Sequence, residues 1–379
     1  MTGREKIEAA FSASGTREIP AVICYEGIYY RDRWDEVTGC PWWYVFSPDI
    51  DEQYEWRANA IERIGQDWFV LPYCRTREGR ENVSIVTRGE DAFEVDASTG
   101  REERLTRPVV AGWSPAGDLA SVHPVRLAQT PGEIEDAIGI PGDWNPDRVT
   151  SEGRDDLAKM MLRGCGRGLY PIQHVSSPFW RLYALWGFEG MMLMVASRPD
   201  LVKCAVDRAL TLAIRQVNEA ALLGARGIWI EECLTDMVSP RAFAEFNLPA
   251  LGKLVQEVRR AGMRSIYYYC GNPSDRWDLL FSAGADALSL EESKKGWTVD
   301  IGEVVKRAGG RCAVLGNLDA INLLPKASEK ELSAEIARQI AAGRRNSNRF
   351  IMSLGSPVTP ATPVSRVRLY CDLVRELSR

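Results

Sequence analysis

Residues 224–272 read GARGIWIEECLTDMVSPRAFAEFNLPALGKLVQEVRRAGMRSIYYYCGN, and this stretch indicates the fold of the whole chain. It contains a short apolar run at 227–230, a long amphipathic segment at 240–261 and a second short run at 264–269. Short apolar runs joined by an amphipathic helix are typical of parallel strands with a crossover helix. The stretch therefore predicts one strand–helix–strand unit.

The same alternation continues in both directions along the chain. We expect strands at residues 19–24, 67–71, 168–174, 227–230, 264–269, 287–290, 311–315 and 350–353. We expect helices between them, several opened by Ser, Asp or Pro at cap-like positions, at residues 199–223, 240–261, 273–283, 299–308 and 329–342. Eight such units predict an α/β fold, a closed (β/α)₈ TIM barrel. A doubly wound open sheet is less favoured, because no Gly-rich phosphate turn occurs early in the chain.

One stretch departs from this alternation. Residues 81–108 alternate in polarity around Gly89 and Gly100, which predicts an antiparallel meander inserted after the second strand. The segment 109–146 is rich in Pro, Gly and Asp and predicts loop with a short helix. We therefore expect a single barrel domain over residues 1–379 with an insertion at about 81–146.

Composition excludes several classes of function. The 379 residues carry a formal net charge of -5, and Lys and Arg are spread along the chain, so a nucleic-acid or membrane-surface patch is not expected. No apolar run approaches the ~20 residues needed to cross a bilayer. The first residues, 1–11, predict a helix instead of a signal peptide. The nine cysteines are dispersed without a CxxC pair, which favours a reducing, cytoplasmic location.

Candidate site residues follow from the fold, because barrel enzymes carry their chemistry on the loops that leave the carboxyl ends of the strands. Polar residues follow the expected strands at Tyr25, Glu26, Tyr73, His174, Glu231, Glu232, Cys270, Asn272, Glu291, Glu292, Asn317, Asp319, Ser353 and Ser356. The chain has two histidines, His123 and His174, so a three-histidine metal site is excluded by counting. His123 lies in a Pro-rich loop, which is typical of a surface residue.

Two of these positions need a choice of direction. Side chains alternate along a strand, so only one of Glu231 and Glu232 is expected to face the cavity, and the other to pair with a basic residue. His174 ends a strand, and the sequence favours a functional and a structural role for it about equally. Cys270 follows three tyrosines and precedes Gly271, which places a thiolate, a good zinc ligand, at the mouth of the barrel.

Several motifs occur in a fixed order along the chain. They are GFEG at 187–190, RPD at 198–200, GARGIWIE at 224–231, SPRAF at 239–243, YYCG at 268–271, GAD at 284–286, LGNLD at 315–319 and SLGSPVTP at 353–360. Together they resemble the uroporphyrinogen decarboxylase superfamily, which includes methyltransferases that move methyl groups between corrinoid proteins, thiols and methylated substrates. The resemblance covers nearly the whole chain.

The chain departs from the motifs of both branches. The decarboxylases carry M-R-Q-A-G-R-Y after the first strand to bind carboxylates, whereas residues 23–31 here read ICYEGIYYR. The zinc methyltransferases use a His-X-Cys pair on the fifth strand and a second cysteine near the last, where this chain has Tyr268, Cys270 and Ser356. A remodelled zinc site of Cys270 with Glu231 or Glu232 and His174 stays open, and we take Cys270 and Glu232 as its candidate ligands.

The resemblance implies a corrinoid-dependent methyltransferase that acts on a small methylated ether or amine. A corrinoid protein is the expected partner, with zinc as the candidate metal and a homodimer as the candidate assembly. We expect catalysis by Glu231, His174 and Tyr268, with a carboxylate or imidazole protonating the leaving heteroatom. The expected substrate-binding residues, chosen for aromatic faces and polar tips, are Tyr25, Glu26, Tyr73, Trp180 and Asn317.

Two alternatives keep the barrel but change the function. A decarboxylase acting on a carboxylated substrate requires an arginine in the cavity, for which Arg31, Arg33 and Arg75 are candidates. A non-catalytic binding or scaffolding protein would carry a degenerate metal site. Turnover of methylated substrates with a corrinoid protein separates these readings.

Overall fold

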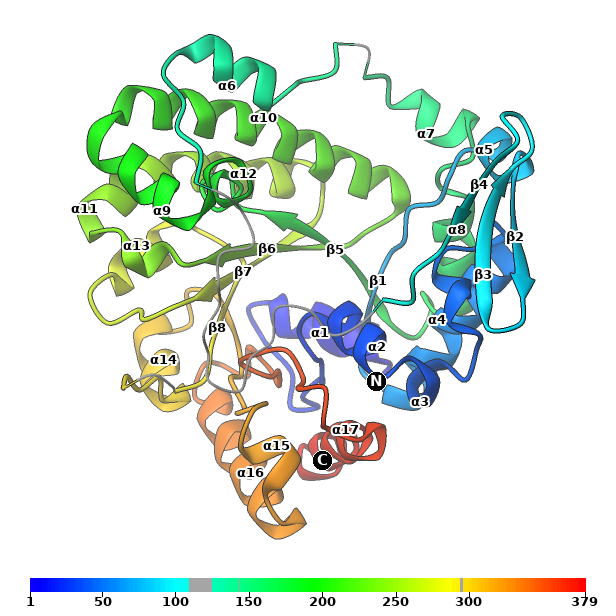
Figure 1. The fold of residues 1–379 in the computed structure, drawn as a ribbon. Coiled ribbons are helices and arrows are strands. Elements are labelled where there is room, and N and C mark those ends of the chain that lie inside the picture. The colour runs from blue at the N-terminus through cyan, green and yellow to red at the C-terminus, as the bar shows by residue number, and fades with distance from the viewer. Residues whose placement is uncertain (109–124, 143, 294–295) are drawn as a thin grey trace.

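The computed structural model describes residues 1–108, 125–142, 144–293 and 296–379. Its main sheet is parallel, has the strand order β1-β5-β6-β7-β8-β9-β10, and curls around a central axis (Figure 1). The strands are β1 Trp68–Val70, β5 Tyr170–Ser176, β6 Gly227–Cys233, β7 Arg264–Cys270, β8 Ala287–Leu290, β9 Ala313–Leu315 and β10 Phe350–Ile351. Seven of the eight expected strands are therefore confirmed, in the expected order.

The first expected strand takes a different form. Residues 19–24 lie between the two edge strands and make a single parallel bridge, from Ala21 to Met352. The amide of Val22 donates to the carbonyl of Met352 at 2.9 Å, and on the other side the amide of Asp67 donates to the carbonyl of Ala21 at 2.8 Å. The prediction of a closed eight-stranded barrel is thus confirmed only in part: a seven-stranded curled sheet has a bridging segment across its gap.

Side chains take over the hydrogen bonds that a regular strand would make at this gap. The Asp67 carboxylate accepts from the amide of Ala21 at 2.7 Å, and the Gln66 side-chain carbonyl accepts from the amide of Ile23 at 3.0 Å. Pro20 has no amide hydrogen and cannot extend a ladder. The buried backbone groups are therefore satisfied without an eighth strand.

Most helices lie outside the curled sheet, whereas those over residues 3–11 and 26–32 lie toward its centre in the view of Figure 1. In the first part of the chain they are α1 Gly3–Phe11, α2 Glu26–Asp32, α3 Trp34–Thr38, η1 Trp42–Val45, α4 Ile50–Ile64, α5 Arg77–Glu81, α6 Pro131–Ala137, α7 Asp147–Ser151 and α8 Asp156–Gly164. Later come α9 Leu182–Ser197, α10 Pro199–Leu223, η2 Thr235–Met237, α11 Pro240–Ala242, η3 Phe243–Asn247, α12 Leu248–Arg260, α13 Trp277–Ser282, α14 Ile301–Ala308, α15 Leu323–Lys326, α16 Glu329–Arg344 and α17 Val364–Leu377. The expected crossover helices are all present, although the one expected at 240–261 contains a π-helical turn at η3.

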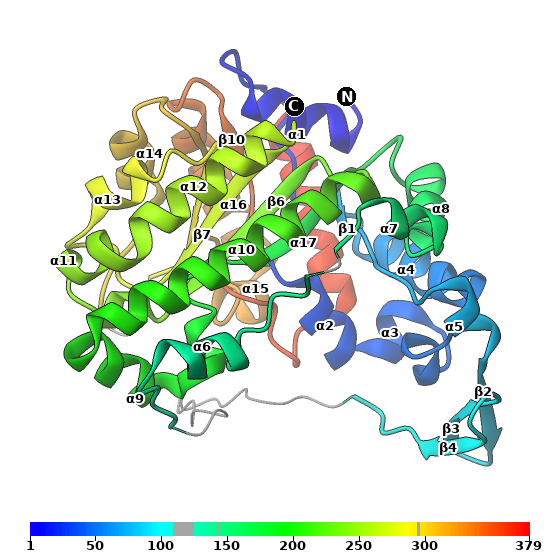
Figure 2. The same cartoon turned by 90° about the horizontal axis from the view of Figure 1, so that it is seen from above.

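The expected meander is confirmed as a separate antiparallel sheet of β2 Val83–Arg88, β3 Asp91–Asp96 and β4 Arg101–Arg104. It lies at the edge of the molecule, away from the curled sheet (Figure 2). Arg75, which precedes it, pairs with Glu94 of β3. The following residues 109–124, with His123, lie outside the described part of the chain. Among the described residues, no helix is long and apolar enough to span a membrane.

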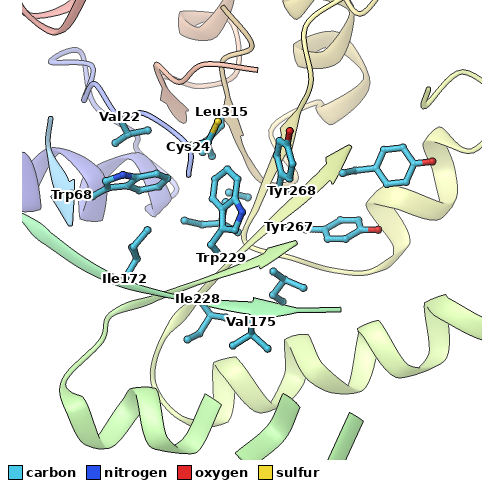
Figure 3. Close-up of a cluster of buried hydrophobic side chains, with 14 of the residues drawn as sticks. Val22, Cys24, Trp68, Ile172, Val175, Ile228, Trp229, Tyr267, Tyr268 and Leu315 are labelled. Carbon is cyan, nitrogen blue, oxygen red and sulfur yellow. The ribbon is translucent and has the colours of Figure 1, made fainter. Parts of the chain in front are cut away.

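Large aromatic side chains fill the inside of the curled sheet. Trp68 and Trp229 are fully buried and meet edge to face with ring centroids 5.6 Å apart. Figure 3 shows Trp68 beside Val22 and Trp229 near Cys24 of the bridging segment, while Tyr267 points to the other side of its strand from Tyr268. The residues at the carboxyl ends of the strands thus lie directly above a packed aromatic core.

Candidate active site

Strand register shows which side chains face the inside of the sheet. In parallel pairs, residues in register point to the same face, and here Ser176, Glu231 and Tyr268 are in register on β5, β6 and β7. Two residues further on, Cys233 is in register with Cys270. Both cysteines are partly buried at the carboxyl ends of their strands, as the prediction for Cys270 requires.

An aromatic cluster lies directly below the layer formed by Cys233 and Cys270. The ring of Tyr25 packs edge to face against His174, Trp229 and Tyr268, with centroid distances of 5.8, 5.9 and 5.4 Å. Trp229 also stacks on Tyr268 at 5.0 Å. Three expected site residues from separate parts of the sequence, Tyr25, His174 and Tyr268, are therefore brought together around Trp229.

Tyr25 is held there by an unusual backbone conformation. It stands immediately before α2 with φ of 53°, in the left-handed region that non-glycine residues seldom adopt. Its hydroxyl is buried and has no hydrogen-bond partner among the described residues. Burial, with the nearby Cys233 and Glu231, raises the pKa of Tyr25 well above its usual value, so the phenol stays protonated.

A cavity of about 420 Å³ opens beside this cluster. Most of its lining is apolar and comes from helices α2, α4 and α8 and from β1, with Tyr30, Trp56, Ile61, Phe69, Val70 and Met161 among the contributors. Its polar lining residues are Glu26, Arg57 and His174 together with Tyr25. A volume of this size suits a small molecule.

Glu26 places a carboxyl group in this apolar lining. The side chain is 2% exposed, and the polar groups near its carboxyl are the Gln66 side chain and the backbone of Val70, which partly oppose the effect of burial on its pKa. Burial raises the pKa of Glu26 to about 7. A substantial fraction of this group is therefore protonated at neutral pH and can donate a proton.

His174 lines the same cavity in its neutral form. Burial lowers the pKa of His174 to about 4, because the charged imidazolium loses its hydration. Its Nε2 atom is buried and makes no hydrogen bond to any described residue. The neutral ring can therefore give or accept one hydrogen bond to a bound ligand, but it is a poor proton donor at neutral pH.

Glu231 stands higher, at the mouth. Its carboxylate accepts a hydrogen bond of 2.8 Å from the hydroxyl of Ser176 on the neighbouring strand. Arg181 lies near Glu231. Burial lowers the pKa of Arg181, and the negative charge of Glu231 opposes that shift. Glu231 is therefore a polar rim group, and it is not among the residues that line the cavity of Tyr25 and Glu26.

Glu232 lies on the opposite face of β6, against the helix layer. It is fully buried and accepts a hydrogen bond of 2.6 Å from the side chain of Asn247 in η3. Burial raises the pKa of Glu232 to about 8. The structure thus separates Glu232 from Cys270, and the expected basic partner is replaced by an amide.

Three further expected substrate-binding residues lie apart from the cavity lining. Tyr73 is 44% exposed and lines a different pocket, with Phe46 and Leu157. Trp180 stacks on Tyr183 with centroids 4.7 Å apart. The amide of Asn317 donates to the backbone carbonyls of Glu291 and Val299, at 3.1 and 2.8 Å, and so ties together the loop that follows β8.

The residues at the expected zinc positions do not fit a metal. The hydroxyl of Tyr268 donates to the carbonyl of Gly355 at 3.0 Å, and that of Ser356 donates to the Glu292 carboxylate at 2.9 Å. Within the described ranges, no group of three or more His, Cys, Asp or Glu side chains is arranged to hold a metal ion. We therefore derive no chemistry through zinc.

One cavity residue was missed at the level of sequence. Arg57 belongs to α4 and follows no strand, so a search of strand ends does not find it. The three arginines that were expected to serve a decarboxylase pair elsewhere: Arg31 with Asp32, Arg33 with Glu36 and Arg75 with Glu94. No local signal in the sequence marks Arg57, because it lies in the middle of a helix.

Comparisons with known proteins concern the family and the fold of the chain. Residues 162–377 match the family model for uroporphyrinogen decarboxylase (URO-D). A uroporphyrinogen decarboxylase of Coxiella burnetii (strain RSA 493 / Nine Mile phase I) is 27% identical over 188 residues, 49% of this chain and 50% of the relative. One of Anaeromyxobacter sp. (strain Fw109-5) is 29% identical over 189 residues, 50% of this chain and 51% of the relative. The chain thus spans about half the length of these curated relatives.

A solved structure extends the likeness to the whole fold. The structure of a methyltransferase from Methanosarcina mazei superposes with a TM-score of 0.69, covers 99% of both chains and is 17% identical. At this identity the likeness concerns the fold. It extends the likeness of fold beyond residues 162–377, which contain every strand of the curled sheet except β1.

Proposed function

This chain belongs to the uroporphyrinogen decarboxylase family, and from that premise we propose that it is an enzyme that demethylates a small methylated ether or amine, passing the methyl group to a corrinoid on a partner protein. The observation that carries the proposal is the Glu26 carboxyl in an apolar cavity beside the neutral imidazole of His174. Demethylation needs a proton donor next to the leaving heteroatom. Glu26 meets that need at neutral pH.

The chemistry assigns a separate task to each cavity residue. As the bond between carbon and heteroatom breaks, its electron pair stays on the heteroatom, which takes the carboxyl proton of Glu26. His174 Nε2 orients the heteroatom through a hydrogen bond, and the Tyr25 hydroxyl adds a second polar contact. The apolar walls exclude water, which strengthens these interactions. Glu26 regains its proton from solvent after the product leaves.

A reduced corrinoid would supply the nucleophile that accepts the methyl group. The cavity, about 420 Å³, is sized for the small substrate and not for a macrocycle as well. This supports a corrinoid that is carried by a partner protein and presented at the mouth, near Glu231 and the Cys233–Cys270 layer. Zinc has no part in the proposal.

A second candidate function, decarboxylation of a small acid, is favoured by Arg57. This alternative needs an arginine in the cavity, and Arg57 is among the lining residues. The curated relatives named above are decarboxylases, which is consistent with it. Against it stands the ionised form of Glu26, which repels a carboxylate, whereas the protonated form can supply the proton that replaces carbon dioxide on carbon and so serves either reaction.

The experiment that tests the proposal follows methyl transfer directly. The purified chain is mixed with free cob(I)alamin and a panel of aryl and alkyl methyl ethers and methylamines, and formation of methylcob(III)alamin is followed by its absorbance. We expect transfer from at least one member, and a loss of about a hundredfold or more in the rate with Glu26→Gln. Glu62→Gln, an exposed change on α4, is the matched control. Carbon dioxide release from carboxylated members without methyl transfer would contradict the proposal.

A further inference from the structure

Arg57 is a cationic side chain that reaches an apolar cavity without an acidic partner. Its Nη1 donates to the carbonyl of Gln53 at 2.8 Å and to the side-chain oxygen of the same residue. Its Cζ atom lies 4.0 Å from the ring centre of Trp56. None of the described carboxylates forms an ion pair with it, whereas the more deeply buried Arg276 pairs with Asp275.

The charge of Arg57 is costly where it stands. Burial lowers the pKa of the guanidinium to about 9, so the group remains positively charged at neutral pH. A partly buried cation without a counter-ion costs free energy that neutral partners such as Gln53 only partly offset. A planar guanidinium is also the side chain best suited to bind a carboxylate through two parallel hydrogen bonds. An anionic ligand would supply the missing charge.

Tyr30 shows how the two charged groups of the cavity are arranged. Burial raises the pKa of Tyr30, with Glu26 adding to the effect and Arg57 opposing it, so this ring lies near both groups. Glu26 belongs to α2 and Arg57 to α4, and both line the same cavity. A ligand that touches both must therefore reach from α2 to α4.

The space between these groups suits a flat, apolar body. Trp56 and Tyr30 meet edge to face with centroids 6.2 Å apart, and Phe69 completes an aromatic wall. Aromatic rings favour offset or edge contacts with a ligand ring. One cavity thus offers a cation, aromatic contacts and a proton donor.

We propose that Arg57 binds the carboxylate of the substrate, and that the substrate is a small aromatic acid whose methylated heteroatom lies toward Glu26 and His174. This inference rests on the proposed demethylation for the direction of the substrate, but the binding of the carboxylate does not depend on turnover. It names a substrate class, the methoxylated aromatic acids, and a residue that selects it.

Binding of a matched pair of probes tests the inference. Calorimetry compares 4-methoxybenzoate with its neutral analogue 4-methoxybenzamide on the unmodified chain. We expect the acid to bind about tenfold to a hundredfold more tightly, the range of a charge-assisted pair. Arg57→Gln should abolish the difference, Arg57→Lys should retain part of it, and Arg63→Gln, an exposed change on the same helix, should leave it intact.

The outcomes separate this inference from the proposed function. Equal binding of acid and amide, or no saturable binding of either up to several millimolar, overturns the role of Arg57. Because this comparison uses the unmodified chain, it holds even if Arg57→Gln does not fold. A preference for the acid without methyl transfer leaves Arg57 in place and overturns demethylation. Methyl transfer from the amide as fast as from the acid overturns only the role of Arg57.

Discussion

The hydroxyl of Tyr268 donates a hydrogen bond of 3.0 Å to the backbone carbonyl of Gly355, and so joins the end of β7 to the loop that follows β10. No side chain fits at residue 355, because a Cβ atom there would lie 2.2 Å from the amide nitrogen of Glu292. Two loops distant in sequence are thereby packed together beside the site. The Tyr268 hydroxyl, which was expected to act in catalysis, thus holds the loop after β10 in place.

Removing this hydroxyl should lower stability more than it alters the site. Tyr268→Phe keeps the ring contacts with Tyr25 and Trp229 but leaves the Gly355 carbonyl without its partner, so we expect a loss of about 1–3 kcal/mol in the free energy of unfolding. Urea unfolding measures it. An unchanged stability together with a rate loss above a hundredfold would instead make Tyr268 a catalytic residue.

Zinc binding should be absent from the unmodified chain and restorable by substitution. Position 356 adjoins the carbonyl that Tyr268 contacts, so Tyr268→His with Ser356→Cys would place an imidazole and a second thiol near Cys270. We expect stoichiometric zinc only in this double variant, measured by metal analysis after dialysis. Ser356→Cys alone is the control. Stoichiometric zinc in the unmodified chain would contradict our reading of the site.

The rate of methyl transfer should fall as pH rises above 7. Burial raises the pKa of Glu26 to about 7, and only the protonated carboxyl can donate its proton, so each pH unit above that value should cost about a factor of ten. The rate at saturating substrate, measured from pH 5 to 9, checks this. A rate that rises through this range would show that Glu26 acts as a base.

The free energy of unfolding should also decrease as pH rises, because of Glu232. Its pKa is raised from 4.5 to about 8, so between these values the folded chain holds a proton that the unfolded chain has lost. The free energy of unfolding then decreases by about 1.4 kcal/mol per pH unit from this group, and levels off above pH 8. Glu232→Gln should remove this contribution and leave that of Glu26 below pH 7, so urea midpoints at pH 5, 6, 7 and 8 should fall less steeply than in the unmodified chain. An identical slope in the variant would show that Glu232 is ionised when folded.

Local pattern predicted most of the fold because each strand is a short, continuous apolar run. The bridging segment at 19–24 was expected to be a strand for the same reason, but Pro20 and the side chains of Gln66 and Asp67 replace its ladder. Sequence pattern records hydrophobicity, and it does not record which partner satisfies each backbone amide. That is why an eighth strand was expected where a bridge is found.

The site was harder to predict than the fold. Strand alternation correctly implied that Glu231 and Glu232 diverge, but it did not say which of them faces inward. Tyr25, Glu26 and His174 were found because they follow apolar runs, whereas Arg57 lies in the middle of a helix. Its role depends on how α4 lies against β1 and α2, and no local signal encodes that packing.

The bridging segment at 19–24 has a consequence for the motions of the molecule. Only a few bonds hold it to each neighbour, so its amide hydrogens should exchange with deuterated water sooner than those of β6 and β7 at the opposite side. Tyr25 and Glu26 come directly after it along the chain. A bound ligand that contacts these two residues would slow that exchange. The exchange rate of the bridging segment would therefore report whether the cavity holds a ligand.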